Sequence, residues 1–155
     1  MSRHRPPVSG VPPDPATRVG PVEPGEVDRR VAAARVGRLA TVTPEGRPHL
    51  VPCCFVLAAD TVYSAVDAKP KTTRTLRRLA NLRATGVAAL LVDHYEEDWS
   101  ALWWVRLDGR GRVLESGEER DRALDLLAGK YDQYRRQPPP GPVVAVDIED
   151  RRAWP

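Results

Sequence analysis

The segment GRLATVTPEGRPHLVPCCFVL, residues 37–57, decides the fold of this chain. It contains the turn sequence TPEG at 43–46, in which proline and glycine stand where a tight turn needs them. Alternation of side-chain character before the turn predicts a strand over 38–43. A second strand over 49–57 is expected to return beside it as an antiparallel partner. A tight hairpin of this kind favours an antiparallel sheet over a doubly wound parallel one.

Periodicity places the other elements around this hairpin. The segment GVAALLV at 86–92 is almost wholly apolar, which predicts a strand that is buried on both faces. Ser116 and Glu119 have the spacing of a capping box, and Gly109 and Gly111 predict a bulge or bend. Strands are expected at 61–66, 86–92, 99–107 and 143–148, and helices at 24–36, 72–83 and 116–136.

This order of elements predicts a mainly β protein of the α+β class, a small antiparallel barrel with helices packed around it. The proline-rich segment 1–22 has almost no large apolar side chains, so we expect a disordered tail there. Residues 23–155 are expected to form one domain.

Composition narrows the class of protein. The net charge of +3 is too mild to indicate a nucleic-acid-binding protein, and 21 acidic residues are interleaved with the basic ones. No apolar run approaches the roughly 20 residues that cross a bilayer, and no secretory signal is recognisable. Cys53 and Cys54 are the sole cysteines, and adjacent cysteines rarely pair. We therefore expect a reduced, cytoplasmic protein with no membrane partner.

Lys69 and Lys71 are the strongest clue to a binding site. They stand just before a predicted helix whose cap is Thr72 or Thr73. A helix N-terminus already favours anions, so two more positive charges there are unhelpful unless something negative binds. The placement predicts a site for a small anion, although a solvated pair of loop lysines remains the alternative. Arg74, Arg77 and Arg78 are interpreted as an outer face of the same helix.

Other reactive side chains have simpler interpretations. His49 is not expected beside either cysteine sulfur, so Cys53 and Cys54 are interpreted as small buried side chains rather than nucleophiles. The acidic run at 93–98 resembles a metal site but lies where a solvated connection is expected, and no metal is predicted. Trp103 and Trp104 are expected on opposite faces of one strand. One of the two is therefore expected to contact a partner or a ligand.

The hairpin, the following segment VYSAVDAKPKTTRTLRRLANLRA at 62–84, and DHYEEDWSALWWVRLDGRGRVLE at 93–115 together resemble the pyridoxamine-phosphate-oxidase-like family. The resemblance covers about 26–154. It implies a six- to seven-stranded antiparallel split β-barrel that forms a homodimer with two cofactor sites at the subunit interface. The last segment resembles the actinobacterial branch that uses the deazaflavin coenzyme F420 rather than FMN.

The resemblance also implies which residues hold the cofactor. The backbone near the ring would come from Pro52 and Cys53. The ribityl chain would be lined by Ser64, Ala65 and Asp67, and the phosphate would be met by Lys69, Lys71 and Thr72. Trp103 and Arg106 match a strand that often contributes across the interface. FMN oxidases usually carry arginines where this chain has lysines, which favours F420 and leaves FMN as the alternative.

The function implied is a cofactor-dependent oxidoreductase that transfers a hydride to a small organic substrate. No protein acid or base can be nominated from the sequence. Two alternatives stay open, an FMN-dependent oxidase or reductase on the same fold, and a non-catalytic flavin or F420 carrier.

Overall fold

The computed structural model describes residues 22–67 and 73–155, with the side chains of 73–76 left out. The predicted tail therefore falls almost wholly outside the described part. The elements within it, in chain order, are α1 (Pro24–Ala33), β1 (Gly37–Val42), β2 (Pro48–Cys53), β3 (Val56–Ala58), β4 (Thr61–Ala65), α2 (Thr73–Thr85), β5 (Val87–His94), the 3₁₀ helix η1 (Trp99–Ala101), β6 (Trp103–Leu114), α3 (Glu118–Lys130), α4 (Asp132–Arg136) and β7 (Val143–Trp154).

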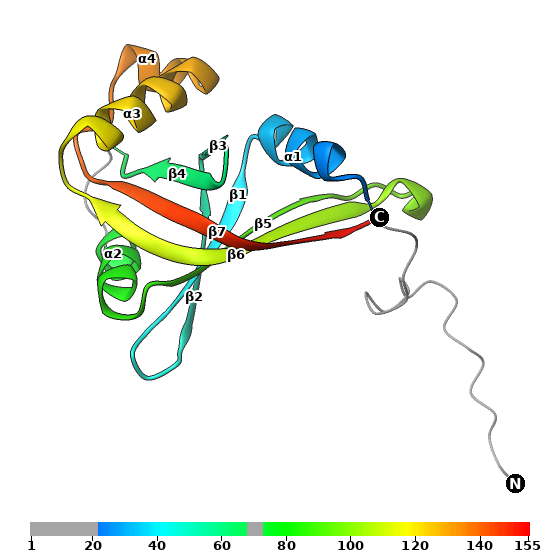
Figure 1. Cartoon of the computed structure of the whole chain (residues 1–155), viewed down its shortest axis with the longest axis horizontal. Helices are drawn as coiled ribbons and strands as arrows, with labels where there is room; N and C mark the ends of the chain where they lie inside the picture. Colours follow the sequence, from blue (N-terminus) through cyan, green and yellow to red (C-terminus); the bar gives the residue numbers. More distant parts are fainter. Residues whose placement is uncertain (1–21, 68–72) are drawn as a thin grey trace, which may run out of the picture.

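All the strands belong to one curled antiparallel sheet, in the order β2-β1-β5-β6-β7-β4-β3 (Figure 1). Its two edge strands, β2 and β3, are consecutive in the chain and are separated by Cys54 and Phe55. The sheet is therefore open between two neighbouring segments of sequence. This architecture confirms the predicted α+β class and the antiparallel split barrel.

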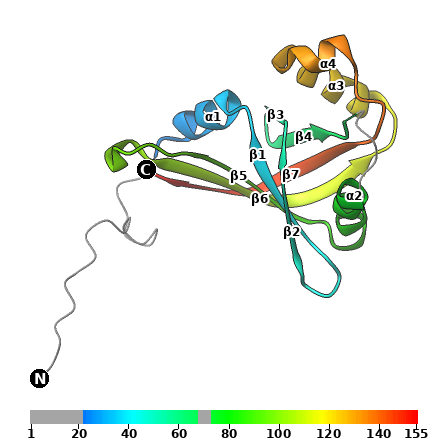
Figure 2. The same cartoon turned by 180° about the vertical axis from the view of Figure 1, so that it is seen from behind.

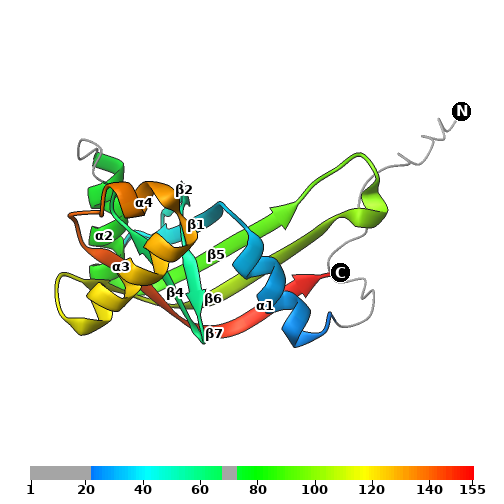
Figure 3. The same cartoon turned by 90° about the horizontal axis from the view of Figure 1, so that it is seen from above.

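The helices cover the sheet in two groups. In Figure 3 α1 crosses the sheet near one end, while α3 and α4 lie together over the other. Figure 2 shows α2 at the end of the sheet opposite the β5–β6 tip. Side chains of α1 and α2 pack on the inner face of the sheet to form the larger hydrophobic core. A second core lies between α3, α4 and β4, so β4 is buried on both faces.

The hairpin that predicted the sheet forms as expected at its turn. The Gly46 N–H donates to the Thr43 carbonyl oxygen at 2.9 Å, and Gly46 has φ +81°. The second strand is not continuous over 49–57, which corrects the sequence-based expectation. It stops at Cys53 and resumes at Val56, where it pairs with β4 instead of β1. The break is stabilised by Phe55, whose side chain is fully buried.

The expectation that the apolar strand over 86–92 is buried on both faces is wrong. Ala88, Leu90 and Val92 lie in the core, whereas Val87 is exposed and the alternate positions are half-buried. The larger core, with side chains of α1 and α2, covers the inner face of β5, and no described element of the chain covers its outer face. The uniformly apolar sequence of β5 therefore reflects an apolar outer face, and this face is not buried within a single copy of the chain.

The predicted strand over 99–107 begins later and runs further. Trp99 lies in η1, where the Asp98 side chain accepts a hydrogen bond from the Ser100 N–H at 3.0 Å. The last strand also extends beyond 148, to Trp154. The predicted bulge is confirmed between Asp108 and Gly109, where the β6–β7 register shifts. A Cβ atom on Gly109 would lie 2.1 Å from the Asp147 carbonyl oxygen, so only glycine fits.

The capping box predicted from Ser116 and Glu119 does not form. Gly117 is the N-cap of α3, with φ +101° and no side-chain hydrogen bond at the cap. The Glu119 carboxylate instead accepts hydrogen bonds from the Tyr63 hydroxyl and the Arg112 guanidinium. The single helix expected to Arg136 is divided at Tyr131, whose backbone is extended. No helix in the described part of the chain is long and apolar enough to span a bilayer.

Candidate cofactor site at the open edge of the sheet

The corner between β2 and β3 is held by two hydroxyl groups. The Ser64 Oγ donates to the Cys54 carbonyl oxygen at 2.8 Å. The Tyr131 hydroxyl accepts from the Phe55 N–H at 3.0 Å and lies 2.9 Å and 3.0 Å from the carbonyl oxygens of Phe55 and Arg35. These contacts satisfy backbone groups at the point where the chain leaves one sheet edge for the other. The opening of the barrel is therefore a fixed feature and not a loose loop.

Several residues predicted for the site gather at this corner. Burial raises the pKa of the Cys53 thiol, and this effect is opposed by a hydrogen bond to Ser64 and by the nearby Arg78 guanidinium. Asp67 lies close enough to Cys53 to act on the same pKa. The Asp67 carboxylate accepts a hydrogen bond from Tyr134, and burial, followed by Asp67, raises the pKa of that phenol. Both groups hold their protons tightly, so the interpretation that Cys53 is not a nucleophile agrees with its surroundings.

The remaining predicted residues occupy different positions relative to this corner. Pro52 is exposed on edge strand β2, and Ala65 is buried within β4. The structure thus brings Cys53, Ser64 and Asp67 together, with Pro52 next to Cys53 in the chain. All three predicted phosphate contacts, Lys69, Lys71 and Thr72, lie outside the described residues.

Arg106 lies on the outer face of the sheet. A shallow groove of about 470 Å³ opens on this face. Its floor is apolar, and Leu50 at its edge is 66% exposed. The Arg38 guanidinium donates to the Asp93 carboxylate at 2.7 Å on one side of the groove. The groove is lined by Arg38, Ala40, Leu50, Ala89, Leu91, Asp93, Trp104 and Arg106.

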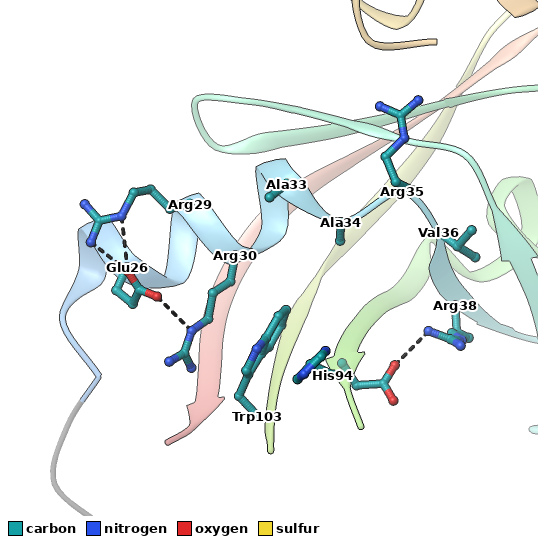
Figure 4. Close-up of a pocket in the computed structure, with 11 residues that line it drawn as sticks. Glu26, Arg29, Arg30, Ala33, Ala34, Arg35, Val36, Arg38, His94 and Trp103 are labelled. Carbon is teal, nitrogen blue, oxygen red and sulfur yellow. Dashed lines mark hydrogen bonds and ion pairs between the residues drawn. The ribbon is translucent and has the colours of Figure 1, made fainter. Parts of the chain in front are cut away.

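Trp103 lies on the opposite side of β6, in a second groove of about 650 Å³ between α1 and the sheet (Figure 4). Its ring stacks on His94, with centroids 6.1 Å apart, and the Arg30 guanidinium carbon lies 5.1 Å from its centroid. Figure 4 shows Arg30 and His94 on opposite sides of the ring, so neither face is open to a ligand. The prediction that Trp103 and Trp104 face opposite sides is confirmed. Trp103 and Arg106 consequently do not converge within one copy of the chain.

The acidic run at 93–98 begins in the last two residues of β5, and no group of three possible metal ligands comes together in the described part of the chain. Asp93 is paired with Arg38, and the His94 Nε2 lies 3.4 Å from the Glu96 carboxylate. The side chains of this run are exposed, as expected for a solvated connection.

Arg78 is the residue near the corner that the sequence interpretation missed. It was expected on the outer face of its helix, but its relative exposure is 7%. Asn81 and Leu82, three and four positions later, are also buried. Residues at this spacing share one side of a helix. The positions of Asn81 and Leu82 could therefore have indicated that Arg78 faces the sheet.

Comparison with known proteins agrees with this geometry. Residues 24–155 match the model of the pyridoxamine 5'-phosphate oxidase family. The chain belongs to this family. The resemblance noted in the sequence is therefore confirmed at the level of the family.

Solved structures related to this family member share its fold at low sequence identity. A conserved hypothetical protein from Mycobacterium tuberculosis, Rv2991, has a TM-score of 0.70 and 20% identity, over 86% of this chain and 84% of that one. An FAD-binding protein from Mesorhizobium loti has a TM-score of 0.65 and 22% identity, over 85% and 94% of the two chains. The heme storage protein HutZ from Vibrio cholerae has a TM-score of 0.64 and 14% identity, over 84% and 89%.

A curated protein also matches this family member in sequence. Streptomycin 6-kinase from Streptomyces griseus is 34% identical over 116 residues, which is 73% of this chain. The chain spans about a third of the length of that relative, 34%. A match of this extent gives no basis for assigning the kinase's activity to the chain.

Proposed function

We propose that this protein is an oxidoreductase that uses coenzyme F420 to transfer a hydride to a small organic substrate, with FMN as the alternative cofactor. The observation that carries the proposal is that the open sheet edge at β2 lies near a buried arginine, Arg78. This arginine has no acidic partner among the described residues. When bound, a cofactor of this class supplies the two-electron chemistry, and the protein supplies binding, orientation and a shaped environment.

The sheet edge fits the ring of such a cofactor. Strand β2 pairs with β1 on one side and has no strand partner on the other in the described part of the chain. Backbone N–H and C=O groups along such an edge are available to a ligand. The polar edge of a flavin or deazaflavin ring offers matching donors and acceptors. Pro52 lacks an N–H, so it can offer only its carbonyl oxygen there.

The charge near α2 fits the phosphate that both cofactors carry. The lysines at 69 and 71 precede the helix in sequence, and Arg78 on the helix lies near Cys53 at the end of β2. Lysines in place of the arginines usual in FMN oxidases support F420 as the first candidate. The chain's own residues would then anchor the anionic end and leave the ring at the sheet edge.

The residues around the corner have a positioning role in this proposal. Ser64 and Tyr131 fix the backbone on which the ring would lie, and the buried Phe55 closes the corner from behind. Cys53 and Tyr134 retain their protons because burial raises the pKa of each group. Neither group is therefore assigned as the acid or base of the reaction.

We further propose that the outer face of the sheet forms a homodimer interface. It combines an exposed leucine, Leu50, with half-buried Leu91 and Trp104, and one flanking arginine, Arg38, is already paired with Asp93. Exposed apolar surface of this kind usually marks an interaction site. A two-fold axis would place the same apolar patch of each copy against the other. This arrangement would also add residues from the partner, such as its Arg106, to the cofactor site.

The test is a titration of the ligand-free protein with F420, FMN and haemin in separate experiments, followed by calorimetry. Reduced F420 is then offered with a panel of organic acceptors, and its oxidation is followed by absorbance. Selective F420 binding with acceptor-dependent oxidation supports the proposal. Selective FMN binding supports the alternative cofactor. Tight binding of reduced F420 without oxidation by any acceptor indicates a carrier, and binding of neither F420 nor FMN contradicts the proposal.

A further inference from the structure

The amine of Lys130, the last residue of α3, lies against aromatic rings. Its Nζ is 4.0 Å from the centre of the Phe55 ring and 5.4 Å from the centre of the Tyr131 ring. This nitrogen is buried and has no hydrogen-bond partner among the described residues. Buried polar groups are normally hydrogen-bonded, so the amine has a bonding capacity that its surroundings do not meet.

A second cation lies close to this amine. The Arg35 guanidinium carbon is 4.6 Å from the centre of the same Tyr131 ring, and the Arg35 Nη1 donates to the Lys130 carbonyl oxygen at 2.9 Å. None of the ion pairs among the described residues includes Lys130 or Arg35. Two positive side chains therefore contact one ring with no carboxylate bound to either.

This setting makes the Lys130 amine easier to deprotonate. Burial, followed by the charge of Arg35, lowers the pKa of Lys130 from 10.5 to about 8, and Cys54 and Cys53 oppose the effect. At pH 8 about half of the amine is therefore uncharged, whereas an ordinary lysine is almost wholly protonated. The chain has 21 arginines and only three lysines, and an arginine at 130 would stay charged. The lysine thus supplies a nucleophile that arginine could not.

Burial limits what can react with this nitrogen. A bulky reagent would have to open the aromatic packing, and a charged one would have to lose its water. Carbon dioxide is small and uncharged, and it adds to uncharged amines in water. It is therefore the class of electrophile that fits an amine held between aromatic rings.

We propose that Lys130 is a carboxylation site, at which carbon dioxide is bound as a carbamate that pairs with Arg35. The nitrogen lone pair forms a bond to the carbon of carbon dioxide. One carbon–oxygen π bond breaks to leave a carboxylate, one amine proton goes to solvent, and nothing is oxidised or reduced. The product carries a negative charge in place of a positive one, so two like charges become an attractive pair.

The pair would join three segments that meet at the open corner of the sheet. Arg35 follows α1, Lys130 ends α3, and Phe55 lies between β2 and β3. The Tyr131 hydroxyl already contacts the backbone of both Arg35 and Phe55. Carbon dioxide would therefore stabilise this corner as a ligand in its own right, whether or not the proposed function is correct.

The experiment records the carbamate carbonyl signal by carbon NMR in buffer with isotope-labelled bicarbonate at pH 8, near the pKa of Lys130. The wild type should give a signal that Lys130→Met and Lys130→Arg both lack. The matched control replaces Lys69 and Lys71, the other two lysines of the chain, by arginine and should keep the signal. A carbamate on the terminal amine is common to all four proteins and cancels. Trapping with trimethyloxonium and peptide mass spectrometry should place the methyl carbamate on Lys130.

Two further measurements test the pairing and its effect. Arg35→Gln should lower the carbamate fraction by at least about tenfold at low carbon dioxide, the loss typical of a charged hydrogen bond. Arg29→Gln is its control, because Arg29 is an exposed arginine of α1 that pairs with Glu26, and it should match the wild type. Bicarbonate, compared with chloride at equal ionic strength, should raise the unfolding temperature of the wild type and not that of Lys130→Met.

The absence of a carbamate signal in the wild type, or an equal signal in the Lys130 variants, overturns the inference. Two variants are used so that the comparison can be made with whichever keeps the wild-type circular dichroism. A wild-type carbamate fraction in Arg35→Gln overturns the pairing, and an equal bicarbonate shift in wild type and Lys130→Met overturns the stabilising effect. None of these results depends on cofactor binding, so failure here is distinguishable from failure of the proposed function.

Discussion

The Ser64 hydroxyl on β4 and the carbonyl oxygen of Cys54 are joined by a hydrogen bond of 2.8 Å. This bond links an inner strand to the corner between the two open edges of the sheet. Ser64 is only 3% exposed, so water cannot replace its hydroxyl as the donor to the Cys54 carbonyl oxygen without opening the corner.

Replacing Ser64 by alanine should therefore destabilise the protein by about 1–2 kcal/mol, because a buried carbonyl loses its donor. Urea denaturation gives the free energy of unfolding. Ser116→Ala is the control, since Ser116 is exposed and makes no cap for α3. A loss for Ser116→Ala as large as that for Ser64→Ala would contradict both the corner contact and the absence of the capping box.

Lys130 gives the protein a distinctive dependence of stability on pH. Its ammonium lies 4.0 Å from the centre of the Phe55 ring and has no hydrogen-bond partner in the described part of the chain. Burial, together with Arg35, lowers the pKa of Lys130 from 10.5 to about 8, although Cys53 and Cys54 oppose the effect. The folded protein therefore binds this proton less tightly than the unfolded chain does.

The cost of the charged amine should be fully present below pH 8 and should disappear as the pH rises toward 10.5. Lys130→Met should consequently be more stable than the wild type at pH 7 by about 1 kcal/mol, after allowance for partial screening by water. The difference should shrink between pH 8 and pH 10. Denaturant titrations of both proteins across this range provide the measurement, and a difference that grows with pH would show that the sign is wrong.

Gly109 and Gly129 should respond in opposite directions to alanine. A Cβ on Gly109 would meet the backbone of β7, whereas nothing lies within 4 Å of the Cβ position on Gly129 in α3. Gly109→Ala should cost more than about 2 kcal/mol through overpacking, and Gly129→Ala should stabilise the helix by up to about 1 kcal/mol. Thermal unfolding of both variants tests the bulge, and a neutral Gly109→Ala would contradict it.

Leu50→Glu should weaken the proposed homodimer. A carboxylate on the outer face would be buried without a partner in the interface, and the dissociation constant should rise by at least about tenfold. Leu126→Glu is the matched control, because Leu126 is a 37% exposed leucine on α3, a helix that lies at the far end of the sheet from the β5–β6 tip (Figure 1). Sedimentation velocity over a range of concentrations measures the dimer dissociation constant of both variants. A wild type that sediments as a monomer at all concentrations would contradict the interface itself.

Local sequence signals determined much of the fold. The turn at 43–46, the bulge at Gly109 and the strand character of 61–66 depend on residues close together in the chain, and each was predicted. The capping box at Ser116 failed because the Glu119 carboxylate is taken by Arg112 on the preceding strand and by Tyr63, which is distant in sequence. The expected continuous strand over 49–57 failed for a similar reason, since Phe55 contacts Tyr131 across the fold.

The sequence by itself determined most of the order of the elements and the antiparallel sheet, because periodicity and turn chemistry act over a few residues. The family followed from the resemblance of the segments 37–57, 62–84 and 93–115. Only the tertiary structure decided that Arg78 is buried, that Trp103 lies between Arg30 and His94, and that no described element covers the outer face of β5. These outcomes depend on which distant segments pack together. A charged or apolar side chain has the same identity in the sequence whether a neighbouring element covers it or leaves it for a ligand or a partner.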